Sequence, residues 1–187
     1  MSRGRSALSV QAAGLDFQNP IVLAAGTAAY GHELADIVDL TALGGLVTKA
    51  VSPEPRAGAP APRVAEFGGG MINAVGLANP GLEEVRGTHL PWLATHLPRT
   101  RKLYNVVGNA VEDYATVVAE LDAAASARGP DGSGGLDGFE LNVSCPNSNP
   151  PALTFGQLTL SSKPSRPPLP SGPRALAAAS SSATTVA

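Results

Sequence analysis

The sequence is poor in cysteine and in long apolar runs. Cys145 is the only cysteine among 187 residues, so no disulfide can form within the chain. A single thiol is compatible with a reducing cytoplasm, which is where we expect the protein to act. No segment approaches the roughly 18 uninterrupted apolar residues of a transmembrane helix, and no apolar stretch follows the arginines near the N-terminus. We therefore expect neither a membrane span nor a signal peptide.

Charged and aromatic side chains are also scarce. The formal net charge is −2, with 15% charged residues, so nothing favours binding to nucleic acid or to a membrane surface. Aromatic residues make up 4%, while glycines and prolines number 21 and 17, which predicts many loops around a core of Ala, Val and Leu. The histidines, His32, His89 and His96, lack the spacing of metal ligands. We interpret them as surface or helix residues and expect no metal site.

Short apolar runs alternate with helical patterns along the chain. The runs that predict strands cover residues 21–24, 46–50, 102–107 and 139–143, after a small hairpin at residues 8–10 and 15–17. The helical patterns cover residues 33–43, 82–97 with an interruption at Pro91, and 111–128. One strand and one helix in every ~30–40 residues predict a parallel α/β architecture with right-handed crossovers.

A polar side chain stands at or near the end of each predicted strand. These residues are Thr27, Lys49, Asn105 and Asn142. Because the carboxyl ends of parallel strands meet at one edge, we expect them to share a site at the mouth of a barrel. In this interpretation Lys49 meets an anionic ligand or an electron-rich cofactor, whereas in the alternative it only reaches out to solvent.

The segment at residues 137–147, DGFELNVSCPN, changes abruptly from an apolar strand to polar side chains. Two interpretations of Cys145 remain open, a small buried apolar residue and a reactive thiol. The amides of Asn142 and Asn147 are costly to bury without partners, and they suit a flat ligand rich in hydrogen-bonding groups.

The long connection after the second strand has no helical period. Residues 51–70 are rich in Pro, Gly and Arg and predict either a functional lid or a disordered loop. We expect Arg56 and Arg63 within it to be solvated. In the following residues 71–77, MINAVGL, Asn73 is a polar residue in apolar surroundings.

The two ends of the chain differ in character from the middle. We expect residues 1–7 and the Ser-, Pro- and Ala-rich residues 157–187 to be disordered, because such a composition cannot bury a core. Residues 129–135 predict a flexible linker. The foldable residues 8–156 fall short of the ~250 residues of a complete (β/α)8 barrel. We interpret the chain as a truncated or frame-shifted form of a longer protein.

Four segments, in this order and spacing, resemble dihydroorotate dehydrogenase, specifically the class 1B catalytic subunit. They are GLDFQNPIVLAAGT, LGGLVTKAVSPEPRAGAPAPRVAE, GGMINAVGLANPG and ELNVSCPN, and the match covers residues 8–156. The resemblance implies an α/β fold, an incomplete (β/α)8 TIM barrel of about four βα units that forms the N-terminal half of a flavin domain. It also implies FMN-dependent oxidation of (S)-dihydroorotate to orotate in de novo pyrimidine (UMP) biosynthesis.

The resemblance assigns roles to individual residues. Cys145 inherits the role of the base that takes a proton from the substrate, which needs a thiolate favoured by nearby donors and positive charge. The implied substrate contacts are Lys49, Asn73, Ala74, Val75, Gly76, Leu77, Asn142 and Asn147. The implied FMN contacts are Ala25, Gly26, Thr27, Lys49, Ala50, Asn105 and Asn142.

The class 1B resemblance also implies a partner, a second subunit with FAD and a [2Fe-2S] cluster that passes electrons to NAD⁺, and an oligomeric full-length form. Two departures from the family stand against activity of this chain: residues 149–154 alter the loop after Asn147, and the later strands that hold the FMN phosphate are absent. An inactive truncated or frame-shifted fragment is therefore one alternative. A dihydropyrimidine dehydrogenase-type flavin barrel is another, disfavoured by Asn147 directly after Cys145-Pro146.

Overall fold

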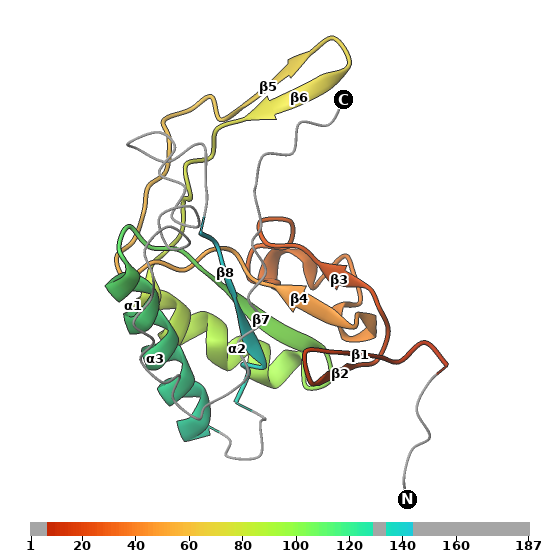
Figure 1. The fold of residues 1–187 in the computed structure, drawn as a ribbon. Helices are drawn as coiled ribbons and strands as arrows, with labels where there is room; N and C mark the ends of the chain where they lie inside the picture. Colours follow the sequence, from red (N-terminus) through yellow and green to blue (C-terminus); the bar gives the residue numbers. More distant parts are fainter. Residues whose placement is uncertain (1–6, 129–133, 144–187) are drawn as a thin grey trace, which may run out of the picture.

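The computed structural model describes residues 7–128 and 134–143, and within them a four-stranded parallel sheet organises the chain (Figure 1). The strands lie side by side in chain order: β3 (Val22–Leu23), β4 (Gly45–Val47), β7 (Arg101–Val106) and β8 (Gly138–Leu141). This order is that of successive units in a (β/α)8 barrel. The predicted α/β fold with about four βα units is thus confirmed. All four predicted strands exist, and their ends differ from the predictions by no more than a few residues.

Several predictions fall outside the described residues. They are the roles of Cys145 and Asn147, the disorder of residues 1–6 and 157–187, the altered loop at residues 149–154, and most of the linker at residues 129–135.

Helices cover one face of the sheet. A helical stretch runs without a break through α1 (Leu82–Glu84), the π-helical η3 (Val85–His89) and α2 (Leu90–His96), and α3 (Val111–Arg128) packs beside it (Figure 1). The predicted interruption at Pro91 is wrong. Proline lacks an N–H and its ring clashes with the carbonyl of residue i−4, and the wider π turn just before it accommodates both effects. In the described residues no helix is long and apolar enough to cross a membrane.

The core lies between the sheet and these helices. Leu46, Tyr104 and Phe139 on the strands are almost fully buried, and they pack with Leu93 and Leu121 of the helices. Burial of each such side chain contributes about 1.5–3 kcal/mol to folding. Because side chains alternate along a strand, the residues between them must face the opposite side of the sheet.

The residues on that opposite side are Val47, Leu103, Asn105 and Glu140, which are absent from the helix-facing cluster. In a barrel this is the inner face, so the alternation places Asn105 and Glu140 toward the interior. One residue of the predicted site, Asn105, thus stands on the inner face of the sheet, near the carboxyl end of β7.

The connection between β3 and β4 contains no long helix, contrary to the prediction for residues 33–43. It forms two short 3-10 helices, η1 (His32–Leu34) and η2 (Leu40–Ala42). Asp39 interrupts the helical backbone between them, and its carboxylate accepts hydrogen bonds from the N–H and hydroxyl of Thr41 at 3.0 and 2.6 Å. These bonds lower the pKa of Asp39. Side chains such as Asp stabilise caps and turns at the expense of a continuous helix.

Two antiparallel hairpins accompany the sheet. β1 (Val10–Ala12) pairs with β2 (Leu15–Phe17), close to the predicted N-terminal hairpin. β5 (Val64–Phe67) pairs with β6 (Gly70–Asn73), although the first of these strands lies in the connection predicted to lack structure. Figure 1 shows the β5–β6 hairpin beyond the parallel sheet, at the top of the view.

Candidate active site

The loops that follow β3 and β4 meet at Lys49. A Cβ placed on Gly26 would lie 3.7 Å from Nζ of Lys49, so the ammonium group stands directly over this glycine. Gly26 has φ +82°, a conformation that side-chain-bearing residues rarely adopt. The Lys49 N–H donates to the carbonyl of Ala29 at 2.8 Å. Two of the predicted cofactor-binding segments, residues 25–27 and 49–50, are therefore brought together by the fold.

Tyr30 holds the same two loops from the helix side. Its hydroxyl donates to the carbonyl of Ala50 at 3.0 Å, and its ring is buried in the core. Burial raises the pKa of Tyr30 far above its ordinary value, so the hydroxyl keeps its proton and remains a donor. The preceding residue, Ala29, has φ 45°, and such left-handed non-glycine residues concentrate at functional sites.

The next two strands supply buried amides. Asn105 on β7 is 2% exposed and Asn142, just beyond β8, is 7% exposed. The Asn105 amide donates to the carboxylate of Glu140, which lies directly opposite it in the β7–β8 register. The Asn142 N–H donates to the carbonyl of Val106 at 2.9 Å. Both predicted asparagines thus lie at adjacent strand ends.

Tyr114 of α3 ties these strand ends together. Its hydroxyl donates to the Asn142 carbonyl at 2.8 Å and lies 3.4 Å from the carbonyl of Gly108, beyond the end of β7. Burial is the main reason that the pKa of Tyr114 is raised, so the hydroxyl remains a donor. The backbone leading toward Cys145 is therefore fixed up to Asn142 from the helix layer.

The predicted substrate segment, residues 73–77, lies in the loop region beyond the sheet. Asn73 ends β6 at the base of the exposed hairpin, and Val75 accepts a backbone hydrogen bond from Ala59 at 3.0 Å. Leu77 has φ 57°, a second left-handed non-glycine residue. The segment is thus held in a specific shape by the connection after β4.

Asn79 joins this segment to the site, and its role was missed from the sequence, where Asn79-Pro80-Gly81 indicates only a turn. The side chain is 8% exposed. Its amide donates to the Leu77 carbonyl at 2.8 Å and to the Ser52 hydroxyl at 2.9 Å, and its oxygen accepts from Gly81 N–H at 3.0 Å. Ser52 follows Lys49 by three residues, so Asn79 links the substrate segment to the loop after β4. The turn itself was the available signal, because burial of Asn79 is visible only in the structure.

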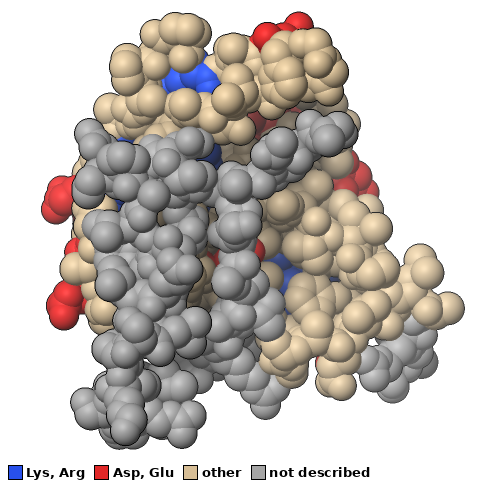
Figure 2. Space-filling model, turned by 45° about the horizontal axis from the view of Figure 1, so that its top comes forward, with Lys and Arg blue, Asp and Glu red and all other residues tan. Residues whose placement is uncertain are grey.

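The arginines of the long connection are structural. Arg63 donates to the carbonyls of Ala57 and Ala59, both at 2.7 Å, and Arg56 donates to Asn109 at 2.9 Å. Both side chains stay partly exposed, as expected for solvated charges, and they also make these hydrogen bonds, which were not predicted. Each arginine hydrogen-bonds to loop atoms of the chain itself. Figure 2 shows the Lys and Arg atoms that are visible on one face of the molecule in separate small areas.

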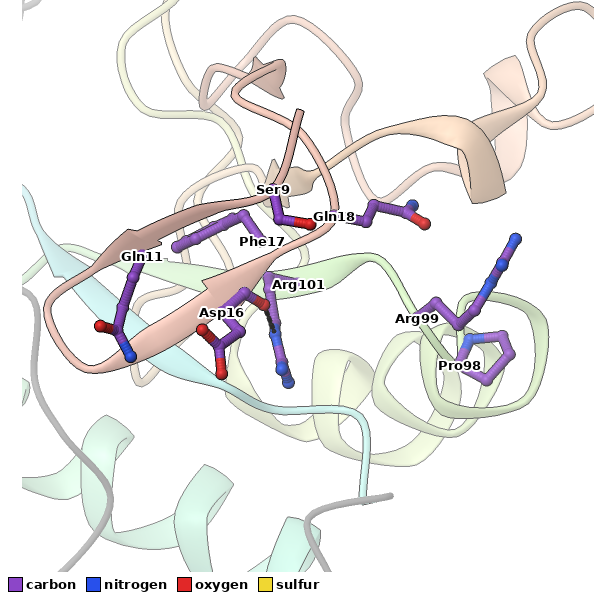
Figure 3. Close-up of a pocket in the computed structure, with 8 residues that line it drawn as sticks. All are labelled: Ser9, Gln11, Asp16, Phe17, Gln18, Pro98, Arg99 and Arg101. Atoms are coloured by element: carbon purple, nitrogen blue, oxygen red, sulfur yellow. Dashed lines mark hydrogen bonds between the residues drawn. The ribbon is translucent and has the colours of Figure 1, made fainter. Parts of the chain in front are cut away.

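A cavity of about 500 Å³ lies elsewhere, at the amino ends of the strands. Figure 3 shows its lining, with Arg101 at the start of β7 hydrogen-bonded to the backbone of Asp16 on β2, and Arg99 on the loop before it. Arg101 is also ion-paired with Asp137 at 2.7 Å, and Asp137 lies 3.4 Å from the buried ammonium of Lys102. Ligands of parallel barrels bind at the opposite, carboxyl edge, so we assign this end a role in stability.

No cluster of three or more potential metal ligands exists among residues 7–128 and 134–143. The groups assembled at the carboxyl edge are instead an ammonium, two buried amides, a carboxylate and backbone N–H and C=O groups. Such a set suits a flat ligand with alternating donors and acceptors and one negative charge.

Comparison with known proteins identifies the relatives of this arrangement. The sequence model of the family described as dihydroorotate dehydrogenase matches residues 7–159. The chain belongs to the dihydroorotate dehydrogenase family.

Curated relatives of two types match the chain about equally well. Dihydroorotate dehydrogenase A (fumarate) from Lactiplantibacillus plantarum is 42% identical over 149 residues, covering 80% of this chain and 46% of the relative. Dihydroorotate dehydrogenase B (NAD(+)), catalytic subunit, from Bacillus cytotoxicus is 43% identical over 150 residues, covering 80% and 45%. This chain thus spans less than half the length of these relatives.

A solved structure shares the fold. The DHODH of Eimeria tenella, in complex with ferulenol, superposes with a TM-score of 0.58 at 23% identity, over 76% of this chain and 38% of that one. At this identity the likeness concerns the fold alone. It agrees with the incomplete barrel seen here.

Proposed function

We propose that the chain carries the N-terminal part of a cytoplasmic enzyme that oxidises (S)-dihydroorotate to orotate with FMN, in de novo pyrimidine biosynthesis. The observation that supports this most is the meeting of Gly26 and Lys49 at the ends of adjacent strands, with Asn105 and Asn142 buried at the next two. Family membership suggests the reaction. The ammonium of Lys49 and the amides of Asn105 and Asn142 are groups that can bind a flavin and a pyrimidine ring.

The described residues fit the isoalloxazine ring of FMN. Gly26 presents backbone without a side chain beside the Lys49 ammonium, so a flat ring placed next to both would meet no Cβ at this position. Ala25, Thr27 and Ala50 would line the same edge, with the buried amides of Asn105 and Asn142 to match polar ring atoms. FMN, when bound, supplies the acceptor for the hydride that leaves C6 of dihydroorotate.

The chain's own residues would handle the substrate and the proton. Lys49 offsets the dihydroorotate carboxylate, and residues 73–77 with Asn142 and Asn147 match the ring's N–H and C=O groups. Cys145, as thiolate, takes the proton from C5. The electron pair of the broken C5–H bond forms the C5=C6 double bond as hydride leaves C6.

A partner subunit is part of the proposal. The B-type relative carries both NAD(+) and the words catalytic subunit in its name. By that likeness, a second subunit with FAD and a [2Fe-2S] cluster would take the electrons to NAD⁺, in an oligomeric assembly. The A-type relative is equally similar, so assay with fumarate and with NAD⁺ plus partner distinguishes the two.

Orotate formation from dihydroorotate with an artificial electron acceptor tests the proposal. A full-length version that contains this chain, loaded with FMN, should form orotate, followed by ultraviolet absorbance, and Cys145→Ser in it should slow the reaction by about 10²-fold or more at neutral pH. The same variant should keep the visible flavin bands, which is the control for folding and cofactor binding. Absence of turnover by the flavin-loaded full-length version, or full turnover by its Cys145→Ser variant, contradicts the proposal.

A further inference from the structure

All 3 histidines of the chain and its only tryptophan gather in one aromatic stack on the helix side of β3 and β4. Tyr30 stacks on His89 with ring centroids 4.0 Å apart, and His89 meets His32 edge-on at 5.0 Å. Trp92 lies between His32 at 4.2 Å and His96 at 4.5 Å. The interpretation of the histidines as surface or helix residues holds, since all three lie in helical elements, but their grouping in one stack was not predicted.

A hydrogen bond joins two of the rings. Nδ1 of His89 and Nε2 of His32 are 3.2 Å apart. One nitrogen must carry a proton and the other a lone pair, because two N–H groups cannot face each other at this distance. The pair therefore tolerates at most one imidazolium and loses the bond when both rings are charged.

The surroundings of the pair favour its neutral form. Partial burial and the neighbouring His32 lower the pKa of His89, while the carboxylates of Glu84 and Glu33 oppose this to a lesser degree. Tyr30, packed against the other side of the His89 ring, is neutral. On the side of η3 toward α3, Arg86 is engaged by Glu83 at 2.6 Å and Glu120 at 2.8 Å.

The stack is connected to the candidate active site by a short path. His89 supports the ring of Tyr30, and the Tyr30 hydroxyl donates to the Ala50 carbonyl at 3.0 Å. Next to Tyr30, the Ala29 carbonyl accepts the Lys49 N–H at 2.8 Å. Movement of Tyr30 would therefore shift the backbone on both sides of the Lys49 side chain.

We propose that His32 and His89 are positioning residues, a proton-sensitive pair that holds Tyr30 and thereby the backbone of Lys49 and Ala50. In the neutral pair the stack is closed and the two loops are fixed. When both rings are protonated, the His32–His89 bond is lost and Tyr30 is released. The coupling between the histidine pair and the backbone of Lys49 and Ala50 is a property of the fold. Its effect on flavin binding rests on the proposed function.

The pH dependence has a defined sign. Since the pKa of His89 in the folded chain lies below its ordinary value of about 6.5, the unfolded state binds the proton more readily. The contribution of the neutral His89 ring to the free energy of unfolding is fully present above about pH 6.5. It is lost as the pH falls toward the lowered pKa of His89. The unfolding equilibrium constant rises by up to about tenfold per pH unit in that window.

Nuclear magnetic resonance across about pH 5–8 tests the pair without flavin or substrate. We expect the backbone amide of Lys49 to shift with the midpoint of His89. The shift should disappear in His89→Phe, which keeps a stacked ring but cannot titrate, and persist in His96→Gln, which touches Trp92 but lies outside the pair.

Two results would overturn the inference: a Lys49 amide that does not move with His89, or one that moves equally in His89→Phe. The titration of the unaltered chain decides the first even if a variant fails to fold. His89→Gln provides a second non-titrating variant. The coupling is measured on the chain without FMN, and FMN binding is measured separately. A chain that shows the coupling but does not bind added FMN would refute the proposed function and leave this inference standing.

Discussion

The side-chain amide of Asn105 donates a hydrogen bond to the carboxylate of Glu140, directly across the β7–β8 ladder. Because a carboxylate only accepts, this contact presents the NH2 group of Asn105 to Glu140 and leaves its oxygen for another donor. The imide N–H of a flavin or pyrimidine ring is such a donor. Glu140 thus orients an amide that we assign to the flavin site.

Glu140→Ala should destabilise the chain by about 1–3 kcal/mol, because it leaves the buried Asn105 amide without its partner. Urea unfolding followed by circular dichroism measures the change. Glu120→Ala is the matched control, since that carboxylate pairs with Arg86 on the surface and should matter by less than about 1 kcal/mol. Equal effects of the two substitutions would refute the importance of the inner-face contact.

Gly26→Ala should cost about 1–2 kcal/mol of stability, because alanine disfavours the left-handed backbone at φ +82°. It should also weaken FMN binding by bringing a methyl group toward Lys49. Gly68→Ala is the control, since a Cβ there meets nothing within 4 Å. Thermal unfolding of both variants checks this. A Gly26→Ala variant as stable as the Gly68→Ala variant would show that the turn is not constrained.

Asn79→Ala should destabilise by roughly 2–3 kcal/mol, because it removes a buried side chain that bonds to Ser52 and Leu77 and leaves their groups unsatisfied. Asn109→Ala, which loses a single exposed contact to Arg56, should cost less than about 1 kcal/mol. Hydrogen exchange should also show faster exchange in residues 73–77 of the Asn79 variant alone. Unchanged protection there would contradict the linking role of Asn79.

Tyr104→Phe should leave stability unchanged or raise it by up to about 1 kcal/mol. The Tyr104 hydroxyl is fully buried and has no hydrogen-bond partner among the described residues, so its removal relieves a desolvation cost. Tyr30→Phe should instead lose about 1 kcal/mol with the bond to Ala50. Melting temperatures of the two variants compare them directly, and a large loss in Tyr104→Phe would reveal a partner for that hydroxyl.

Local periodicity accounts for the parts of the fold that the sequence predicts well. The helix at residues 111–128 has the predicted bounds, because one apolar stripe along it packs through Val117, Leu121 and Ala125. The four parallel strands follow from short apolar runs, of which β4 and β7 are largely buried while Val22 of β3 is exposed. The resemblance to the family also predicted that Gly26 and Lys49 share a site, which local periodicity alone does not predict.

The missed features depend on pairing between distant or irregular segments. His32 and His89 are 57 residues apart, so no spacing rule indicates their contact. The β5–β6 hairpin turns at Gly68-Gly69 within a glycine run, a turn signal that was masked by the surrounding prolines. The helix at residues 82–96 continues past Pro91 because a π turn precedes it, and propensity alone does not predict such a turn.

Titration of FMN into the chain, followed by quenching of flavin fluorescence, tests the central claim most directly. If the loops after β3, β4, β7 and β8 form a flavin site, binding is saturable and weakens about tenfold or more in Lys49→Met, a loss of about 1.4 kcal/mol. Arg99→Met, at the opposite edge of the sheet, should bind FMN like the unaltered chain. No saturable binding, or equal binding by the Lys49 and Arg99 variants, would contradict the account.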